Sequence, residues 1–492
     1  MFNFKTKPYA HQLTALELSC DRPEYALFMD MGTGKTKVAI DNFCYLYAKK
    51  EIDTVLILSN KGSYLNWVNQ EIPIHMPDEI PRHLTYWNNV PSKFLQTTYA
   101  FLLHPLESLK IMVMNTEALA HERAFDFALE LVQNTKCMII VDESTSIKNE
   151  GAKRTKNIIE LGKHAKYRRI LTGEPIANSP LDIWAQAKFL NPTLLRFSSF
   201  YSFRAYYAKM IDLASGPRTF KKITGYNNIE QLEKNIATWS YRIKKEECLD
   251  LPAKIYQTYN IQLTEEQQRL YDQLREESIA WLSQEAMVST PLAITKLLRL
   301  HQLTCGHIVD DFKNSHPIAN KRIDALMEII EEAQGKIIIW ATYRKNIEDI
   351  REAIVKKYGP GVCATYYGDT SDDSRSEAIA DFQEQDICSV NNASDVIYAH
   401  KKGVRFFIGN PKTGGYGITL TAANTVIYYS NNYELETRLQ SEDRCHRIGQ
   451  TKPVNYIDIV CEKTVDEKII KALKAKKHLS ATILGDELKD WL

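Results

Sequence analysis

The chain has 492 residues, of which 44% are hydrophobic and 25% are charged, and its formal net charge is +1. This length exceeds what one hydrophobic core usually serves, and the composition excludes long disordered stretches. Since the charge is nearly balanced, any nucleic-acid-binding surface must be local rather than a property of the whole chain.

Cysteine spacing and hydropathy indicate in which compartment the protein works and whether it enters a membrane. The nine cysteines form no C-x-x-C pair, and no apolar run approaches the roughly 18 residues that span a bilayer. The opening residues, MFNFKTKPYAHQ, contain no apolar signal-peptide core. We therefore expect a cytoplasmic protein with reduced thiols and no membrane association.

Short apolar runs alternate with longer amphipathic segments in two parts of the chain. The first part contains YALFMD, TVLILSN, IMVMN, CMIIVDE and RRILTG, and the second contains KIIIWAT, ATYYG, VRFFIGN, TVIYYSN and NYIDIV. Apolar strands separated by helical patterns indicate parallel sheets that are covered on both faces. The sequence therefore predicts an α/β fold with two doubly wound lobes.

The region between these two parts has a helical pattern. From Pro192 to Pro317 the pattern is helical, as in LTEEQQRLYDQLREESIAWLSQ, and no comparable apolar strands are visible. We expect lobe 1 at 1–191, helical insertions and a linker at 192–317, lobe 2 at 318–475 and a tail at 476–492. Residues 384–403 are interpreted as a surface insertion.

The first chemical signal is a glycine-rich run, Gly32-Thr33-Gly34-Lys35-Thr36, between the strand YALFMD and a helical pattern. Such a loop turns backbone N–H groups toward phosphates, while the lysine neutralises charge and the threonine hydroxyl binds Mg²⁺. The alternative is an ordinary glycine-rich turn. The position between strand and helix favours the phosphate loop.

The second signal is the acidic pair Asp142-Glu143 at the end of CMIIVDE. Ligands of parallel sheets bind at the carboxyl ends of strands, which places this pair beside the phosphate loop. We expect Asp142 to hold Mg²⁺ and Glu143 to orient and deprotonate the attacking water.

The third signal is the segment QSEDRCHRIGQ. If it is helical, Gln440, Arg444 and Arg447 share one face and can meet an anion together. Arginines supplied by a second domain stabilise the charge of phosphoryl transfer. A solvated, salt-bridged helix is the alternative.

Together these segments resemble a Swi/Snf-family ATPase of helicase superfamily two, and the small phage and bacterial members in particular. The resemblance implies that the two doubly wound lobes are RecA-like, with helical insertions between them. The matching segments run in the family's order: PYAHQ, DMGTGKT, VLILSNKGSYLNWVNQE, IVDESTSIKN, LTGEPIANSPLDIW, YYGDTSDDSR, GGYGITLTAA and HRIGQ. Thr145 stands where the family usually has histidine, and Glu174 stands where it usually has threonine.

The resemblance implies roles for further residues. Gln12 would contact adenine, Gly417 and Gln440 would contribute to the nucleotide site, and Thr172, Gly173 and Glu174 would couple hydrolysis to DNA contact. The implied DNA contacts are Ser59 and Lys61 in the first lobe, and Thr342, Tyr343, Lys412 and Thr413 in the second.

The function that follows is an ATP- and Mg²⁺-dependent motor that moves along double-stranded DNA as a monomer, with little sequence preference. Catalysis would use Lys35, Asp142 and Glu143 from one lobe and Arg444 and Arg447 from the other. A strand-separating helicase and a nucleotide-gated clamp are the alternatives. The aromatic run FSSFYSFRAYYAKM could stack bases, but we interpret it as the core of a helical insertion.

Overall fold

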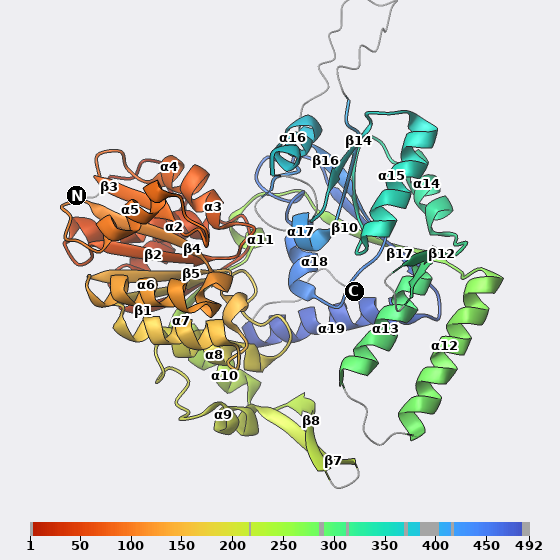
Figure 1. Cartoon of the computed structure of the whole chain (residues 1–492), viewed down its shortest axis with the longest axis horizontal. Coiled ribbons are helices and arrows are strands. Elements are labelled where there is room, and N and C mark those ends of the chain that lie inside the picture. The colour runs from red at the N-terminus through yellow and green to blue at the C-terminus, as the bar shows by residue number, and fades with distance from the viewer. Residues whose placement is uncertain are drawn as a thin grey trace, which may run out of the picture. The chain divides into compact units, whose positions relative to one another are not determined.

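The computed structural model describes residues 3–215, 218–284, 290–310, 314–368, 372–383, 403–414 and 418–484. The chain divides into two compact units. The first contains the residues up to Ile211, Ile223–Asp250 and the described residues from Lys476 onward. The second contains Leu251–Ala475 and 212–222. Each is built around its own parallel sheet (Figure 1).

The sheet of the first unit has seven strands, all parallel, in the order β3-β4-β2-β5-β6-β1-β9. Its strands are β1 Glu24–Met29, β2 Thr54–Ser59, β3 Arg82–Tyr86, β4 Leu109–Asn115, β5 Cys137–Asp142, β6 Tyr167–Leu171 and β9 Ser240–Ile243.

Helices cover both faces of this sheet, because alternate residues of each strand enter different cores. Phe28 packs in a core with α5–α10, whereas Leu27 packs in a core with α1 and α2. The helices are α1 Ala10–Ser19, α2 Lys35–Ala48, α3 Tyr64–Asn66, α4 Ile72–His75, α5 Lys93–Leu102, α6 Glu122–Gln133, α7 Lys153–His164, α8 Ile183–Leu190, α9 Phe200–Tyr207, α10 Ile229–Ala237 and α11 Lys245–Cys248.

The sheet of the second unit has six parallel strands in the order β10-β17-β16-β13-β15-β14. They are β10 Lys254–Ile261, β13 Lys336–Trp340, β14 Cys363–Tyr366, β15 Phe406–Gly409, β16 Ala423–Tyr428 and β17 Val454–Cys461. A small sheet joins β11 His307–Val309 to β12 Ser315–Pro317.

Apolar cores again lie on both faces, one of them with α14 and α15 and the other with α16. The helices of this part of the chain are α12 Glu265–Gln284, α13 Thr290–Thr304, α14 Arg322–Glu332, α15 Arg344–Tyr358, α16 Asp372–Gln383, α17 Pro411–Gly414, α18 Leu435–Glu442 and α19 Val465–Leu484. The predicted fold of two doubly wound parallel α/β lobes is confirmed.

The region 192–317, in which the sequence shows no comparable apolar strands, contains strands as well as helices. This region contributes the edge strand β9 to the first sheet and the edge strand β10 to the second. It also contains a hairpin of β7 Ala208–Ser215 and β8 Arg218–Tyr226. Strand β10 reads KIYQTYNI and is largely exposed, because an edge strand needs no continuous apolar run.

Two smaller expectations have clear outcomes. Phe203 and Tyr207 of the aromatic run are buried in the first unit's core, as predicted, whereas Tyr201 is exposed. Residues 384–402 of the expected insertion lie outside the described residues. Among the described helices, none is both long and apolar enough to cross a membrane.

Candidate nucleotide and nucleic-acid sites

The glycine-rich run forms the turn between β1 and α2. Gly32 and Gly34 have φ angles of +79° and +88°, a left-handed conformation that favours glycine. Gly34 is the N-cap of α2, so the backbone N–H groups of that helix's first turn face the loop. The Lys35 ammonium donates to the carbonyl oxygens of Met29 and Asp30, at 2.9 and 3.2 Å. This arrangement is that of an anion-binding loop.

Gln12 of α1 packs directly on this loop. Its amide donates to the Thr33 carbonyl at 3.0 Å and accepts from the Tyr9 N–H at 3.0 Å. A Cβ atom at Gly34 would lie 2.1 Å from the Gln12 amide nitrogen. Gly34 is therefore fixed by this close approach as well as by its φ angle.

The acidic pair lies at the carboxyl end of β5. Asp142 Oδ2 accepts from the Trp67 indole at 2.9 Å and from the Ser59 hydroxyl at 3.1 Å, and Oδ1 accepts from the Glu143 N–H. Burial raises the pKa of Asp142, and the Trp67 bond, the nearby Lys35 charge and the Ser59 bond oppose that rise. The carboxylate thus has a fixed orientation in a place where a cation would stabilise its ionised form.

Glu143 has a left-handed backbone, with φ of +48° and ψ of +61°. For a residue with a side chain, this conformation costs about 1 to 3 kcal/mol and is concentrated at functional sites. The left-handed conformation of Glu143 turns the chain sharply after β5.

Ser59, a predicted DNA contact, lies in the interior of the first unit. It was expected to contact DNA, but it is fully buried at the end of β2 and its hydroxyl donates to Asp142. Its position in the structure is that of a support for the acidic pair, together with Trp67. Lys61, two residues later, is exposed and can still reach an external phosphate.

The predicted coupling element follows β6 and lies against the phosphate loop. The Thr172 N–H donates to the Leu27 carbonyl of β1, and a Cβ atom at Gly173 would lie 3.4 Å from the Met31 nitrogen. The Glu174 N–H donates to the Thr172 hydroxyl at 3.2 Å. Thr172 and Gly173 therefore lie against the strand and turn that form the candidate nucleotide site, and Glu174 follows them directly.

The arginine segment of the second unit is helical only in its first part. Helix α18 includes Gln440 but ends at Glu442, so Arg444 and Arg447 lie in the turns that follow it. The two guanidinium groups still converge, because both donate to the carbonyl oxygen of Ile418, at 3.2 and 3.3 Å. Gly417 of the predicted nucleotide set lies outside the described residues.

Contacts of α18 explain why the helix stops where it does. Glu442 is fully buried and accepts from Arg438, Lys254 and Tyr256. Beyond it, the His446 ring bonds the Pro252 carbonyl at 2.7 Å. These contacts bend the chain back over β10, the first strand of the second unit.

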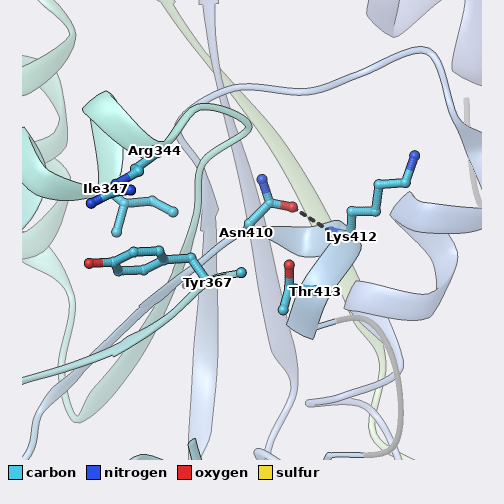
Figure 2. Close-up of a pocket in the computed structure, with 7 residues that line it drawn as sticks. Arg344, Ile347, Tyr367, Asn410, Lys412 and Thr413 are labelled. Carbon is cyan, nitrogen blue, oxygen red and sulfur yellow. Dashed lines mark hydrogen bonds between the residues drawn. The ribbon is translucent and has the colours of Figure 1, made fainter. Parts of the chain in front are cut away.

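A pocket of about 320 Å³ lies at the carboxyl ends of β14 and β15 (Figure 2). Its lining residues are Arg344, Ile347, Tyr367, Gly368, Asn410, Lys412 and Thr413. Asn410 accepts from the Lys412 N–H at 2.8 Å, the bond drawn in Figure 2. The Lys412 ammonium makes an exposed ion pair with Glu434 at 3.1 Å, a kind of contact that contributes little stability.

Of the four predicted DNA contacts in the second unit, two line this pocket. Lys412 and Thr413 line the pocket, but Thr342 bonds Ser430, and the Tyr343 hydroxyl bonds the His301 ring at 2.8 Å. Arg344 and Tyr367 were missed from sequence. Both follow the ends of apolar strands, which is the signal that could have identified them.

Comparisons with known proteins identify the family of the chain. The family model of the SNF2-related domain matches residues 11–307, and that of the helicase conserved C-terminal domain matches residues 321–449. The chain is 26% identical over 402 residues to the TATA-binding protein-associated factor MOT1 of Saccharomyces cerevisiae, covering 71% of this chain and 20% of that protein. It is 26% identical over 469 residues to an uncharacterized ATP-dependent helicase of Mycoplasma pneumoniae, covering 93% and 40%.

Among solved structures, the Sulfolobus solfataricus SWI2/SNF2 ATPase core in complex with dsDNA is 25% identical, with a TM-score of 0.43, covering 98% of this chain and 94% of that one. The chain spans between a fifth and two fifths of the length of these two curated relatives. Because the SNF2-related model alone matches more than half of its residues, the chain belongs to the SNF2-related domain family.

Proposed function

We propose that this chain is an ATP-hydrolysing motor that moves along double-stranded DNA. The observation that supports this most directly is the meeting of the phosphate loop and the Asp142–Glu143 pair at one edge of the first sheet. Membership of the SNF2-related family supports the same activity, since the names of its relatives include an ATP-dependent helicase. The duplex as partner is proposed from the sequence motifs GGYGITLTAA and HRIGQ.

The nucleotide phosphates would bind the N-terminus of α2, with Lys35 moving from the Met29 and Asp30 carbonyls onto the phosphate oxygens. Glu143 would accept a proton from the attacking water, and Arg444 and Arg447 would stabilise the charge of the γ-phosphate. Gln12 would meet the base, and Gln440 would assist the arginines.

Magnesium fits the oxygen ligands present in the first unit. Asp142 supplies a carboxylate in a fixed orientation, and Thr36, in the first turn of α2, supplies a hydroxyl. In the described part of the chain, no cluster of three His, Cys, Asp or Glu residues suits a metal ion. Magnesium does not require one, because it takes one or two protein oxygens together with substrate phosphates. When bound, it would neutralise charge on the β- and γ-phosphates.

DNA phosphates would bind the pocket of the second unit and Lys61 of the first. Arg344, Lys412 and Thr413 offer the pocket charged and hydroxyl donors, and the Lys412–Glu434 pair can exchange for a phosphate at little cost. Contacts to the backbone carry no sequence information. Little sequence preference is therefore expected.

A strand-separating helicase is the second candidate, because the structure contains a hairpin that was not predicted from the sequence. The β7–β8 hairpin is a two-stranded element of the kind that can act as a wedge, and Lys209, Lys221 and Lys222 on it are exposed. This hairpin gives the alternative a physical basis.

The experiment that separates these functions measures ATPase rate, triplex displacement from a blunt duplex and unwinding of a forked duplex under identical conditions. We expect duplex DNA to stimulate hydrolysis more than single strands of equal length, and the triplex to be displaced without fork unwinding. Fork unwinding without triplex displacement would favour the helicase. ATP binding without turnover on any DNA would favour a nucleotide-gated clamp.

A further inference from the structure

Arg242 of β9 joins the phosphate loop to the coupling element within the first unit. Its guanidinium group lies 3.2 Å from the Asp30 carboxylate and 3.8 Å from the Glu174 carboxylate, and it donates to the Gly173 carbonyl at 2.6 Å. Only 16% of its side chain is exposed. A single cation therefore lies between two carboxylates that are distant in sequence.

Asp30 is itself part of the phosphate loop. Its carbonyl accepts from the Lys35 ammonium at 3.2 Å and from the Thr33 hydroxyl at 2.7 Å. Its carboxylate also accepts from the Lys245 N–H at 3.1 Å. A shift of Asp30 therefore changes the position of the carbonyl that holds the catalytic lysine.

The other oxygen of Glu174 reaches the C-terminal helix. The Ser480 hydroxyl of α19 donates to Glu174 Oε2 at 2.7 Å. The neighbouring Leu479 packs against the first unit's core, and the Lys476 ammonium donates to the Asn178 side chain at 2.8 Å. These contacts dock the last turns of α19 onto the loop that carries Glu174.

A continuous series of direct contacts thus runs from Lys35 through Asp30, Arg242 and Glu174 to Ser480. It depends on a glutamate at position 174, because a threonine is too short and uncharged to pair with Arg242 and still accept from Ser480. Ion pairs in partly buried positions, such as those of Arg242, are screened by solvent less than exposed ion pairs. The series can therefore transmit a displacement of the loop to the helix.

We propose that Glu174 is a positioning residue that couples the phosphate loop to helix α19 through Arg242 and Ser480, so that nucleotide binding and docking of α19 stabilise each other. This inference rests on the proposed nucleotide site. By linkage, any stabilisation of the docked helix by nucleotide must be matched by tighter binding of nucleotide when the helix is docked.

The test uses the full chain, with ATPγS and Mg²⁺ as the probe and two readouts that do not require turnover. Hydrogen exchange of α19 should slow at residues 476–484 when ATPγS binds, and this protection should disappear in Ser480→Ala and Glu174→Gln. ATPγS affinity should fall about fivefold in each variant, at the low end of typical coupling. The double variant should lose no more than either single variant.

Two matched substitutions make the outcome specific. Ser480→Thr keeps the hydroxyl and should restore both readouts. Lys476→Ala removes a contact of the same helix that lies outside the series, and it should leave ATPγS affinity unchanged. Parental behaviour of Ser480→Ala, or an equal loss in Lys476→Ala, would overturn the inference. Failure of the parent to bind ATPγS would instead overturn the proposed function together with this inference.

Discussion

At the scale of single residues, Glu143 is distinguished by its backbone. Its left-handed conformation follows directly after Asp142, whose two oxygens are engaged by Trp67, Ser59 and the Glu143 N–H. The two carboxylates of the pair thus differ in environment: one is fixed by three donors and the other emerges from a strained turn. This difference supports separate roles in metal binding and proton transfer.

Glu143→Gln should retain ATPγS binding and abolish turnover, because an amide keeps the size of the side chain but cannot accept the proton of the attacking water. Equilibrium binding and steady-state ATPase assays provide the measurement. Glu150→Gln is the matched control, since its side chain bonds Trp184 and an amide can keep that bond. Parental turnover in Glu143→Gln would exclude this carboxylate as the general base. Lys35→Ala should instead weaken binding itself.

For Ser59 and Tyr343, the sequence predicts the position in the fold but not the partner of the side chain. Both follow apolar strands, so the sequence placed them correctly at the carboxyl ends of sheets. Which way each hydroxyl points depends on partners far along the chain, namely Asp142 for Ser59 and His301 for Tyr343. No local pattern in the sequence contains that information.

At the scale of elements, the apolar strands and the helices between them could be predicted, whereas three of the four edge strands, β3, β9 and β10, could not. Central strands are buried on both faces and must be apolar, but β10 needs only one paired neighbour and reads as a polar segment. The end of helix α18 at Glu442, before the two arginines, could not be predicted for a different reason. Buried Glu442 and the His446 contact to Pro252 override the helical spacing of the arginines.

Helix α13 carries a buried histidine that should make stability depend on pH. Burial lowers the pKa of His301 from 6.5 to about 4, Asp466 opposes this, and Arg322 and His307 reinforce it. Between these two values the unfolded chain binds more protons than the folded chain. The contribution of neutral His301 to the free energy of unfolding is therefore complete above about pH 6.5. It is lost as the pH falls toward 4, by up to about 1.4 kcal/mol per pH unit.

His301→Gln should flatten the dependence of the urea unfolding midpoint on pH between 4 and 6.5, because the amide can still bond Tyr343 but does not titrate. His104→Gln, at an exposed position, is the control and should keep the parental slope. The same slope in both variants would show that another group controls this transition.

At the scale of the whole molecule, hydrolysis should require residues from both units. Arg447→Ala should bind ATPγS nearly as the parent does yet lose about 10³-fold in turnover, as substitutions of arginine fingers typically do. Single-turnover hydrolysis at saturating ATP gives the measurement. Lys452→Ala removes a nearby exposed cation and should leave the rate unchanged. A loss of less than about tenfold in Arg447→Ala would remove this residue from the catalytic set.

The pairing of β10 with β17 determines the order in which the chain can fold during synthesis. The two strands are separated by 200 residues, so β10 leaves the ribosome about 10 to 40 s before its partner exists. The first sheet, by contrast, has all its strands once residue 243 has emerged. The contacts of Lys254 and Pro252 with the arginine segment cannot form until Glu442 and His446 have been made. A nascent chain would thus have a complete phosphate loop while its arginines are still unmade, and it could hold a nucleotide well before it could hydrolyse one.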